Sequence, residues 1–158
     1  MSYERARAHL EKYSLADRIR LFDVSSATVT LAAKALGTEE ARIAKSLSFS
    51  VGDTPILIIA AGDAKIDNAR YKATFGTKAR MLDFESVEPL IGHAVGGVCP
   101  FGVNEGVRVY LDESLRRFDT VYPAAGTPSS AVELTIPELE KAAEPVSWVD
   151  VTRLPEGI

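Results

Sequence analysis

Apolar and polar residues alternate along this chain with a period that changes from one segment to the next. Near the start, apolar residues recur every three or four positions, on Tyr3, Ala6, Leu10 and Tyr13. That spacing places them on one face of a helix over residues 2–13, with Ser2 as its N-cap. Residues 19–24 alternate between polar and apolar, which predicts a half-buried strand.

The middle of the chain is richer in strand signals. Two apolar runs, 46–51 and 55–61, are joined by Gly52, Asp53 and Thr54, and this arrangement predicts a β-hairpin. Shorter strands are expected at 79–82, 107–111, 120–122 and 146–151.

Capping residues mark the ends of the remaining helices. The expected start and stop residues are Thr28 with Gly37, Asp67 with Gly76, and Asp83 with Gly92. A short helix is also expected after Thr38, reaching about residue 44. Thr135 and Glu138 have the spacing of a capping box, which predicts one more helix.

Helices and strands therefore mix without the regular rhythm of βαβ units. The sequence also lacks a G-x-G-x-x-G or Walker motif, which removes support for a nucleotide-cofactor fold. We predict the α+β class, with a mixed, largely antiparallel sheet.

Composition narrows the class of protein further. The 158 residues are 46% hydrophobic and 25% charged, which fits one compact domain over residues 1–158. No apolar run approaches the roughly 18 residues of a membrane-spanning helix, and the polar start does not resemble a signal peptide. One cysteine and two histidines argue against a disulfide framework, a zinc cluster and a Ser-His-Asp triad.

Lys45 is the first candidate for chemistry. It is expected where the short helix after Thr38 meets the apolar strand. An ammonium group there offers three N–H donors to a phosphate, ribose or carbonyl oxygen. The alternative is a surface lysine whose stem lies along apolar side chains.

A glycine-rich loop is the second candidate. Residues 92–102 hold four glycines and one proline, so the backbone can approach a ligand closely and its amides can hold an oxygen. Cys99 lies in this loop, but no general base other than His93 is near it in sequence. We therefore expect Cys99 and His93 to be packed residues, not a nucleophile and its base.

Two further segments follow or separate strand signals. Asp63 and Asp67 come after the apolar strand 55–61, where a carboxylate can line a site or cap a helix. Residues 122–134 are mostly small, which suits either the wall of a pocket or an ordinary connecting loop.

Taken together, these segments resemble the YbaK/EbsC family, the free-standing relatives of the editing domain inserted in bacterial prolyl-tRNA synthetase. The resemblance covers nearly the whole chain, and the order and spacing of its motifs are specific. It rests on Leu36-Gly37, the segment around Lys45, Gly62-Asp63, Gly96 to Gly102, Val109 to Asp112, and Ala124-Ala125-Gly126.

The resemblance implies a barrel-like sheet surrounded by helices and a hydrolase that removes a wrong amino acid from the 3′ end of a tRNA. It implies a catalytic group of Lys45, Gly96, Gly97 and Pro100. It implies a substrate-binding group of Phe22, Asp63, Val98, Cys99, Ala124, Ala125, Gly126 and Ser129. No metal ion and no cofactor are expected.

This chemistry suits the residues present. An aminoacyl ester is already activated, so positioned water and amides aimed at the tetrahedral oxyanion can suffice. The ribose 2′-hydroxyl can assist proton transfer, and a cysteinyl substrate can use its own thiol.

One position departs from the family pattern. Deacylases of Cys-tRNA(Pro) carry an aspartate after the glycine-rich turn, where this chain has Ala131. The loop 127–130 is more similar to another subgroup, so alanine, serine, threonine or another small amino acid stays open as the substrate.

The charge distribution limits how the RNA partner is held. The net charge is −4, but residues 30–80 hold eight basic and five acidic residues, whereas residues from 112 onward hold four basic and nine acidic. We expect few contacts, made to the single-stranded 3′ end of an aminoacyl-tRNA, with a synthetase as a second possible partner. The protein is expected in the cytoplasm, without membrane contact. A non-catalytic module that binds a tRNA end or a nucleotide is the rival hypothesis.

Overall fold

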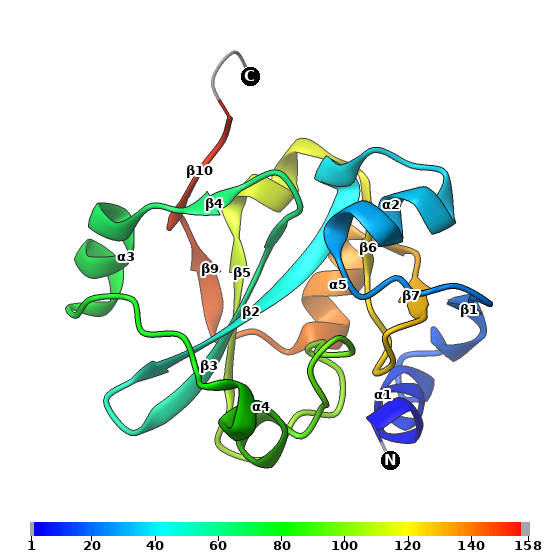
Figure 1. Cartoon of the computed structure of the whole chain (residues 1–158), viewed down its shortest axis with the longest axis horizontal. Coiled ribbons are helices and arrows are strands. Elements are labelled where there is room, and N and C mark those ends of the chain that lie inside the picture. Colours follow the sequence, from blue (N-terminus) through cyan, green and yellow to red (C-terminus); the bar gives the residue numbers. More distant parts are fainter. Residues whose placement is uncertain (1, 156–158) are drawn as a thin grey trace.

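A six-stranded sheet forms the centre of the protein (Figure 1), in a computed structural model that describes residues 2–155. Its strand order is β8-β6-β2-β3-β5-β9. The strands are β2 (Ile43–Val51), β3 (Thr54–Ala61), β5 (Arg108–Asp112), β6 (Thr120–Pro123), β8 (Leu134–Thr135) and β9 (Ser147–Val149). The predicted hairpin is confirmed as β2 and β3, which pair antiparallel across a turn where Gly52 has φ +60°.

The pairing directions refine the predicted sheet. The α+β class and the mixed sheet are confirmed, but the antiparallel share of the central sheet is smaller than expected. β6 joins β2, β5 joins β3 and β9 joins β5, and all three of these pairings are parallel. The two strands of each of these pairs are far apart in sequence, which leaves room for the crossover that a parallel pairing needs.

Five helices and two small two-stranded sheets surround the centre in the described residues. The helices are α1 (Ser2–Glu11), α2 (Val29–Leu36), α3 (Asn68–Phe75), α4 (Phe84–Ile91) and α5 (Ile136–Ala143). The small sheets pair β1 (Ile19–Leu21) with β7 (Ser130–Val132) and β4 (Lys65–Ile66) with β10 (Thr152–Arg153). Three 3₁₀ turns lie at Ala16–Arg18, Glu40–Arg42 and Glu113–Arg117.

The helix ends follow the predicted capping residues. The side chains of Thr28 and Asp67 accept hydrogen bonds from the backbone N–H groups of Leu31 and Arg70. The capping box of Thr135 and Glu138 is present. Asp83 stands at the N-cap of α4 but makes no capping bond with its side chain.

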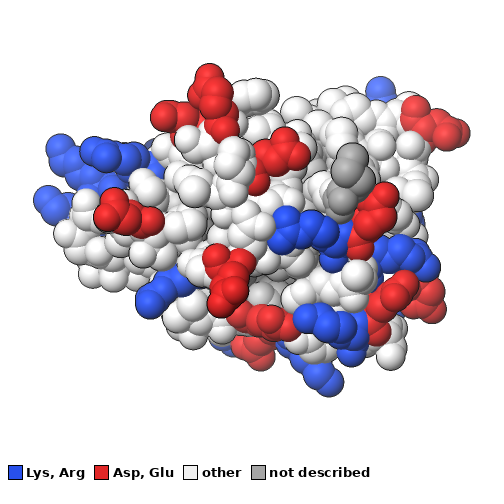
Figure 2. All heavy atoms as spheres, turned by 90° about the horizontal axis from the view of Figure 1, so that it is seen from below, with Lys and Arg blue, Asp and Glu red and all other residues white. Residues whose placement is uncertain are grey.

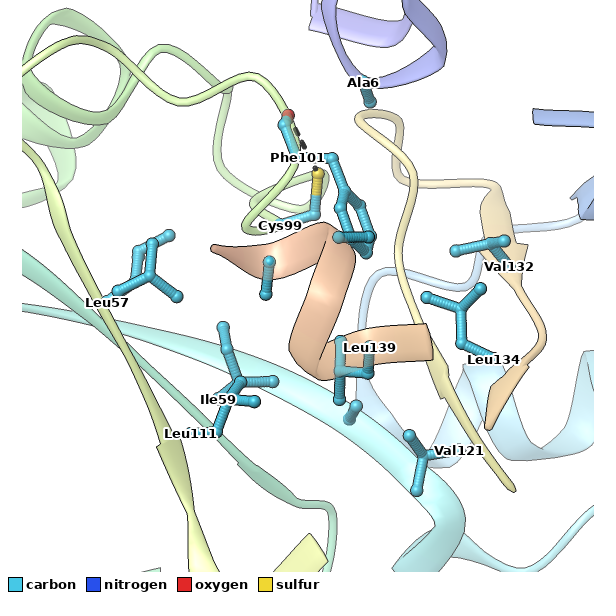
Figure 3. Packing of buried hydrophobic residues seen from close by; sticks show 14 of the residues in the cluster. Ala6, Leu57, Ile59, Cys99, Phe101, Leu111, Val121, Val132, Leu134 and Leu139 are labelled. Atoms are coloured by element: carbon cyan, nitrogen blue, oxygen red, sulfur yellow. Dashed lines mark hydrogen bonds between the residues drawn. The ribbon is translucent and has the colours of Figure 1, made fainter. Parts of the chain in front are cut away.

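The main core lies on the face of the sheet that carries Leu57 and Ile59. Figure 3 shows these residues with Leu111 of β5 and Leu139 of α5, and all four are fully buried. Helices α1, α4 and α5 pack on this face through the buried residues Ala6, Leu10, Val87, Ile91, Leu139 and Ala142. The opposite face is covered by α3 through Tyr71 and by α2 through Ala32 and Ala33.

Three predicted elements need correction. The helix expected after Thr38 is only the turn Glu40–Arg42, because pairing with β6 extends β2 back to Ile43. The strand expected at 79–82 is a single bridge between Phe49 and Met81. Residues 122–134 are expected to form a pocket wall or a connecting loop, but within them β7 pairs with β1. Among the described residues, the helices are too short or too polar to cross a bilayer.

Candidate functional site

A cavity of about 400 Å³ opens beside β2. Five stretches of chain line it, within residues 26–32, 43–48, 81–87, 95–98 and 122–131. Since these stretches are distant in sequence, the fold is what brings the candidate segments to one place.

An interruption in strand pairing lies at the side of this cavity. β6 pairs with β2 at Ile43 and Ala44. Further along the same edge, Ser48 O accepts a hydrogen bond from Leu82 N at 3.1 Å, and Ser50 N donates to Arg80 O at 2.9 Å. Between these contacts, residues 45–47 have no strand partner on this edge within residues 2–155, and all three line the cavity. Peptide groups of β2 there are left for a ligand or water.

Lys45 is the third residue of β2, not a residue at a helix–strand junction as predicted. Its ammonium Nζ donates to Gly62 O at 3.3 Å and to Ala64 O at 2.5 Å. The structure places Lys45 half-buried in the cavity wall, where burial lowers its pKa and the nearby carboxylate of Asp63 opposes that shift. Two of its three donors are occupied, and the third has no partner among the described residues.

Asp63 lies near Lys45 but outside the cavity lining. Its two carboxylate oxygens accept hydrogen bonds from Arg117, at 2.6 and 3.1 Å. This bidentate pair holds the pKa of Asp63 below its usual range, so the carboxylate stays ionised and acts on Lys45 through its charge.

The glycine-rich loop contributes Gly96 and Val98 to the cavity wall. Gly97, between them, is buried against the turn at Gly126. A Cβ on Gly97 would lie 2.7 Å from the Gly126 carbonyl and from Thr127 N, so only glycine lets the two loops touch. Pro100 does not line this cavity and instead lines a second one beside α1, with His9 and Gly102.

Cys99 and His93 belong to the same loop, but both are fully buried and neither lines the cavity. The Nε2–H group of His93 donates to Phe101 O at 2.6 Å, and its Nδ1 accepts from Ser2 Oγ at 2.6 Å. Cys99 Sγ is 3.6 Å from the same Nε2, which already carries a proton. Burial lowers the pKa of His93 and raises the pKa of Cys99 to about 12. The thiol therefore stays protonated and His93 cannot serve as its base.

In the last predicted segment, residues 122–134, some residues line the cavity and others are buried next to it. Ala124 lines the cavity, whereas Ala125 is fully buried and its N–H donates to Ser130 Oγ. Gly126 has φ +90° and packs against the backbone of Ser2.

Phe22 and Ser129 lie outside the cavity lining, next to each other. The N–H of Phe22 donates to Ser129 O at 2.9 Å, which continues the pairing of β1 with β7. The predicted roles in substrate binding and catalysis stay predictions for all of these residues, whether they line the cavity (Lys45, Gly96, Val98 and Ala124) or lie outside its lining (Phe22, Asp63, Gly97, Cys99, Pro100, Ala125, Gly126 and Ser129).

Some cavity residues escaped the sequence analysis. Ser46 lies on β2, and its buried hydroxyl has no partner within residues 2–155. Phe84 and Met81 also line the cavity although both are well exposed. Phe84 shares the helical spacing of the buried Val87 and Ile91, so its spacing alone favours a core position and gives no sign of this role.

No group of three or more His, Cys, Asp or Glu side chains in residues 2–155 is arranged to hold a metal ion. The donors that face the cavity are instead an ammonium group, hydroxyls and backbone amides.

Comparison with known proteins shows which family shares the segments that form this cavity. A family model for the aminoacyl-tRNA editing domain matches residues 24–142, which include every stretch that lines the cavity. The uncharacterized protein YwhH of Bacillus subtilis is 49% identical over 154 residues, which cover 97% of this chain and 98% of YwhH.

Two further relatives connect the chain to prolyl-tRNA synthetase. A crystal structure of a candidate trans-editing enzyme for prolyl-tRNA synthetase matches with a TM-score of 0.86 and 30% identity, over 96% of this chain and 97% of that one. A proline–tRNA ligase of Bacillus cereus is 24% identical over 113 residues, which cover 71% of this chain but 19% of the ligase. The resemblance predicted from the motifs is confirmed: the chain belongs to the aminoacyl-tRNA editing domain family, with a YbaK-like fold.

Proposed function

We propose that this protein hydrolyses the ester between a small non-cognate amino acid and the 3′ end of a tRNA, acting in trans, with tRNA(Pro) as the first substrate to test. The observation that carries the proposal is the cavity itself. It joins Lys45, an unpaired stretch of β2 and the Gly96–Val98 loop within a member of an editing family.

The cavity offers donors to the oxygen atoms of the substrate. The free N–H donor of Lys45 can hold a substrate oxygen, and its charge favours an oxygen that is gaining negative charge. Backbone amides of the glycine-rich loop and of the unpaired β2 edge are further donors. In hydrolysis, water adds to the ester carbonyl carbon and the ribose oxygen leaves with a proton, so the products are a free amino acid and an uncharged tRNA.

The cavity wall favours a small amino acid. Ala44, Ala124 and Ala131 offer only methyl groups, and Ser46 adds a hydroxyl that lacks a partner in the described protein. We expect a polar atom of the substrate against Ser46, either the α-amino group or a side-chain hydroxyl. An apolar wall distinguishes substrate side chains that differ by one small group by only about 1–3 kcal/mol. A wall that contains Ala131 is therefore compatible with several small amino acids as the substrate.

A deacylation panel tests the proposal. The protein is incubated with tRNA(Pro) charged separately with alanine, cysteine, serine and threonine, with prolyl-tRNA(Pro) as the cognate control, and loss of the ester is followed. We expect turnover of at least one small non-cognate substrate and little turnover of the prolyl ester. Binding of tRNA without hydrolysis of any substrate would favour the non-catalytic module instead. A synthetase partner and a cytoplasmic location stay predictions.

A further inference from the structure

The mouth of the cavity carries an apolar rim. Phe84 is 73% exposed, Met81 61% and Val95 46%, and all three line the cavity. Single exposed apolar side chains are common on protein surfaces, but three around one cavity indicate a surface that binds something.

The backbone holds this rim against the sheet. Met81 forms a bridge with Phe49, and the next residue, Leu82, donates its N–H to Ser48 O on β2. Phe84 then begins α4, whose buried Val87 and Ile91 anchor the helix in the core. The backbone that carries Met81 and Phe84 is therefore held in place before any ligand arrives, which lowers the entropic cost of binding.

Cations precede the rim along the same segment. Lys78 and Arg80 are exposed, and within residues 2–155 neither has a carboxylate within ion-pair distance. In Figure 2, Lys and Arg side chains gather at the left end of the face, on the side where α3 lies in Figure 1. Beyond Phe84, α4 carries the acidic Glu85 and Glu88. An anionic chain that reaches the rim is thus favoured on the Lys78 side and disfavoured over α4.

We propose that the rim of Phe84 and Met81 stacks the terminal base of a single-stranded tRNA 3′ end, while Lys78 and Arg80 hold phosphates of the preceding nucleotides. This inference rests on the proposed function and assigns the residues that position the tRNA end over the cavity. Aromatic side chains interleaved with cations are the combination that binds single-stranded nucleic acid, because bases stack and phosphates pair.

The first experiment measures binding alone. A short RNA ending in CCA is titrated against the same RNA with an abasic 3′-terminal nucleotide. Phe84→Ala should bind the CCA RNA about tenfold more weakly, which is the scale of one lost stacking contact. It should also no longer distinguish the two RNAs. Phe84→Trp should bind within about threefold of the unmodified protein.

Leu90→Ala is the matched control for Phe84→Ala. Leu90 is 43% exposed on the same helix but does not line the cavity, so its loss should leave RNA binding unchanged. Phe84 is largely solvated and Leu90 is partly so, and we expect the thermal unfolding midpoints of both variants to stay near that of the unmodified protein.

The second experiment tests the cations through salt dependence. Lys78→Gln with Arg80→Gln should reduce the slope of log K against log salt by about 1.4, since each phosphate contact on a single strand contributes about 0.7. Lys12→Gln with Lys141→Gln removes the same charge from exposed positions outside the cavity and should leave the slope unchanged.

Two outcomes would overturn the inference. One is unchanged discrimination between the CCA and abasic RNAs by Phe84→Ala. The other is a Phe84→Ala protein that binds RNA normally but no longer binds a synthetase, which would make the rim a protein-docking surface. Failure of the proposed function looks different, because the unmodified protein would then bind the RNA end without hydrolysing any aminoacyl ester.

Discussion

Burial affects the ionisable groups of two regions that the sequence singled out, and of these two only the one around Lys45 faces the cavity. Lys45 lies half-buried in the cavity wall, held by two backbone carbonyls and with one donor free. Cys99 and His93 are fully buried, and both ring nitrogens of His93 are occupied. Burial lowers the pKa of Lys45 and of His93 and raises that of Cys99, but only Lys45 can contact a ligand in the cavity.

The difference shows that residue type is a poor guide to reactivity. Cysteine and histidine are the more reactive pair in principle, but here desolvation keeps both neutral, and their hydrogen bonds hold the loop in its conformation. Lysine is less reactive, but its place at the unpaired edge of β2 gives it access to a ligand. If this contrast is correct, substitutions in the first region change activity and those in the second change stability.

Lys45→Ala should have the largest effect. Loss of this cation from the cavity wall should lower kcat/KM for deacylation by about 10²–10³-fold, the scale measured for removal of one donor to a developing oxyanion. The free energy of unfolding should fall by no more than about 1 kcal/mol, since the two carbonyls can bond water instead. Lys45→Arg should not restore activity, because a planar guanidinium cannot reproduce a compact ammonium. Full activity of Lys45→Ala would contradict the assigned role.

Gly97→Ala should come next, and it tests how the loop is supported. The added methyl would meet the Gly126 carbonyl at 2.7 Å, so we expect a loss of about 1–3 kcal/mol in stability together with most of the activity.

Gly106→Ala separates this clash from backbone strain. Gly106 has φ +93° with no atom within 4 Å of an added Cβ, so its substitution strains the backbone without a clash. Urea unfolding measures the stability of the two variants, and deacylation assays measure their rates. Gly106→Ala should lose stability but keep its rate, and an equal loss of rate in both would argue against a specific role for the Gly97 contact.

A pH effect on stability should be smaller and should belong to His93. Because burial lowers its folded pKa, the unfolded chain binds a proton at pH values where the folded protein does not. The stability from the neutral ring is therefore complete above about pH 6.5 and is lost as the pH falls toward the folded pKa, by at most about 1.4 kcal/mol per pH unit.

His93→Gln isolates this contribution. Urea unfolding at pH 7.5 and 5.5 should show a larger loss of stability at the lower pH for the unmodified protein than for the variant. His9 is present in both proteins, so the difference between them reports His93 alone. Identical losses would mean that His93 binds its proton equally well in the folded and unfolded states, which would contradict the lowered pKa.

The sequence predicted local structure better than it predicted which distant strands pair. The hairpin of β2 and β3, the caps at Thr28 and Asp67 and the capping box at Thr135 follow from nearby residues alone. The parallel entry of β5, β6 and β9 depends on distant pairing, which local periodicity does not encode.

The same limit applies to the candidate site. Four of the predicted residues line one cavity: Lys45, Gly96, Val98 and Ala124. They could be found from the sequence because a lysine beside an apolar strand, or a run of glycines and small residues, marks their segments. Phe84 could not be found this way, since its helical spacing equals that of core residues and only the fold decides which side chain stays outside.

Cys99→Ala should have the smallest effect on activity, and it gives the most direct test of the buried region. Cys99 is fully buried, and burial raises its thiol pKa to about 12, so it supplies neither a nucleophile nor a charge to the cavity. Its removal should cost about 1 kcal/mol of stability through lost packing and leave kcat/KM within about twofold.

Cys99→Ser sharpens the result, because it keeps the size of the side chain and changes its chemistry. The serine hydroxyl can donate to Phe101 O, which accepts from the thiol in the present structure. Deacylation rates and urea unfolding should therefore show activity retained in both variants with a modest loss of stability. Loss of all turnover in Cys99→Ser and Cys99→Ala alike, with the folded state intact, would revive covalent catalysis and remove the contrast between the two regions.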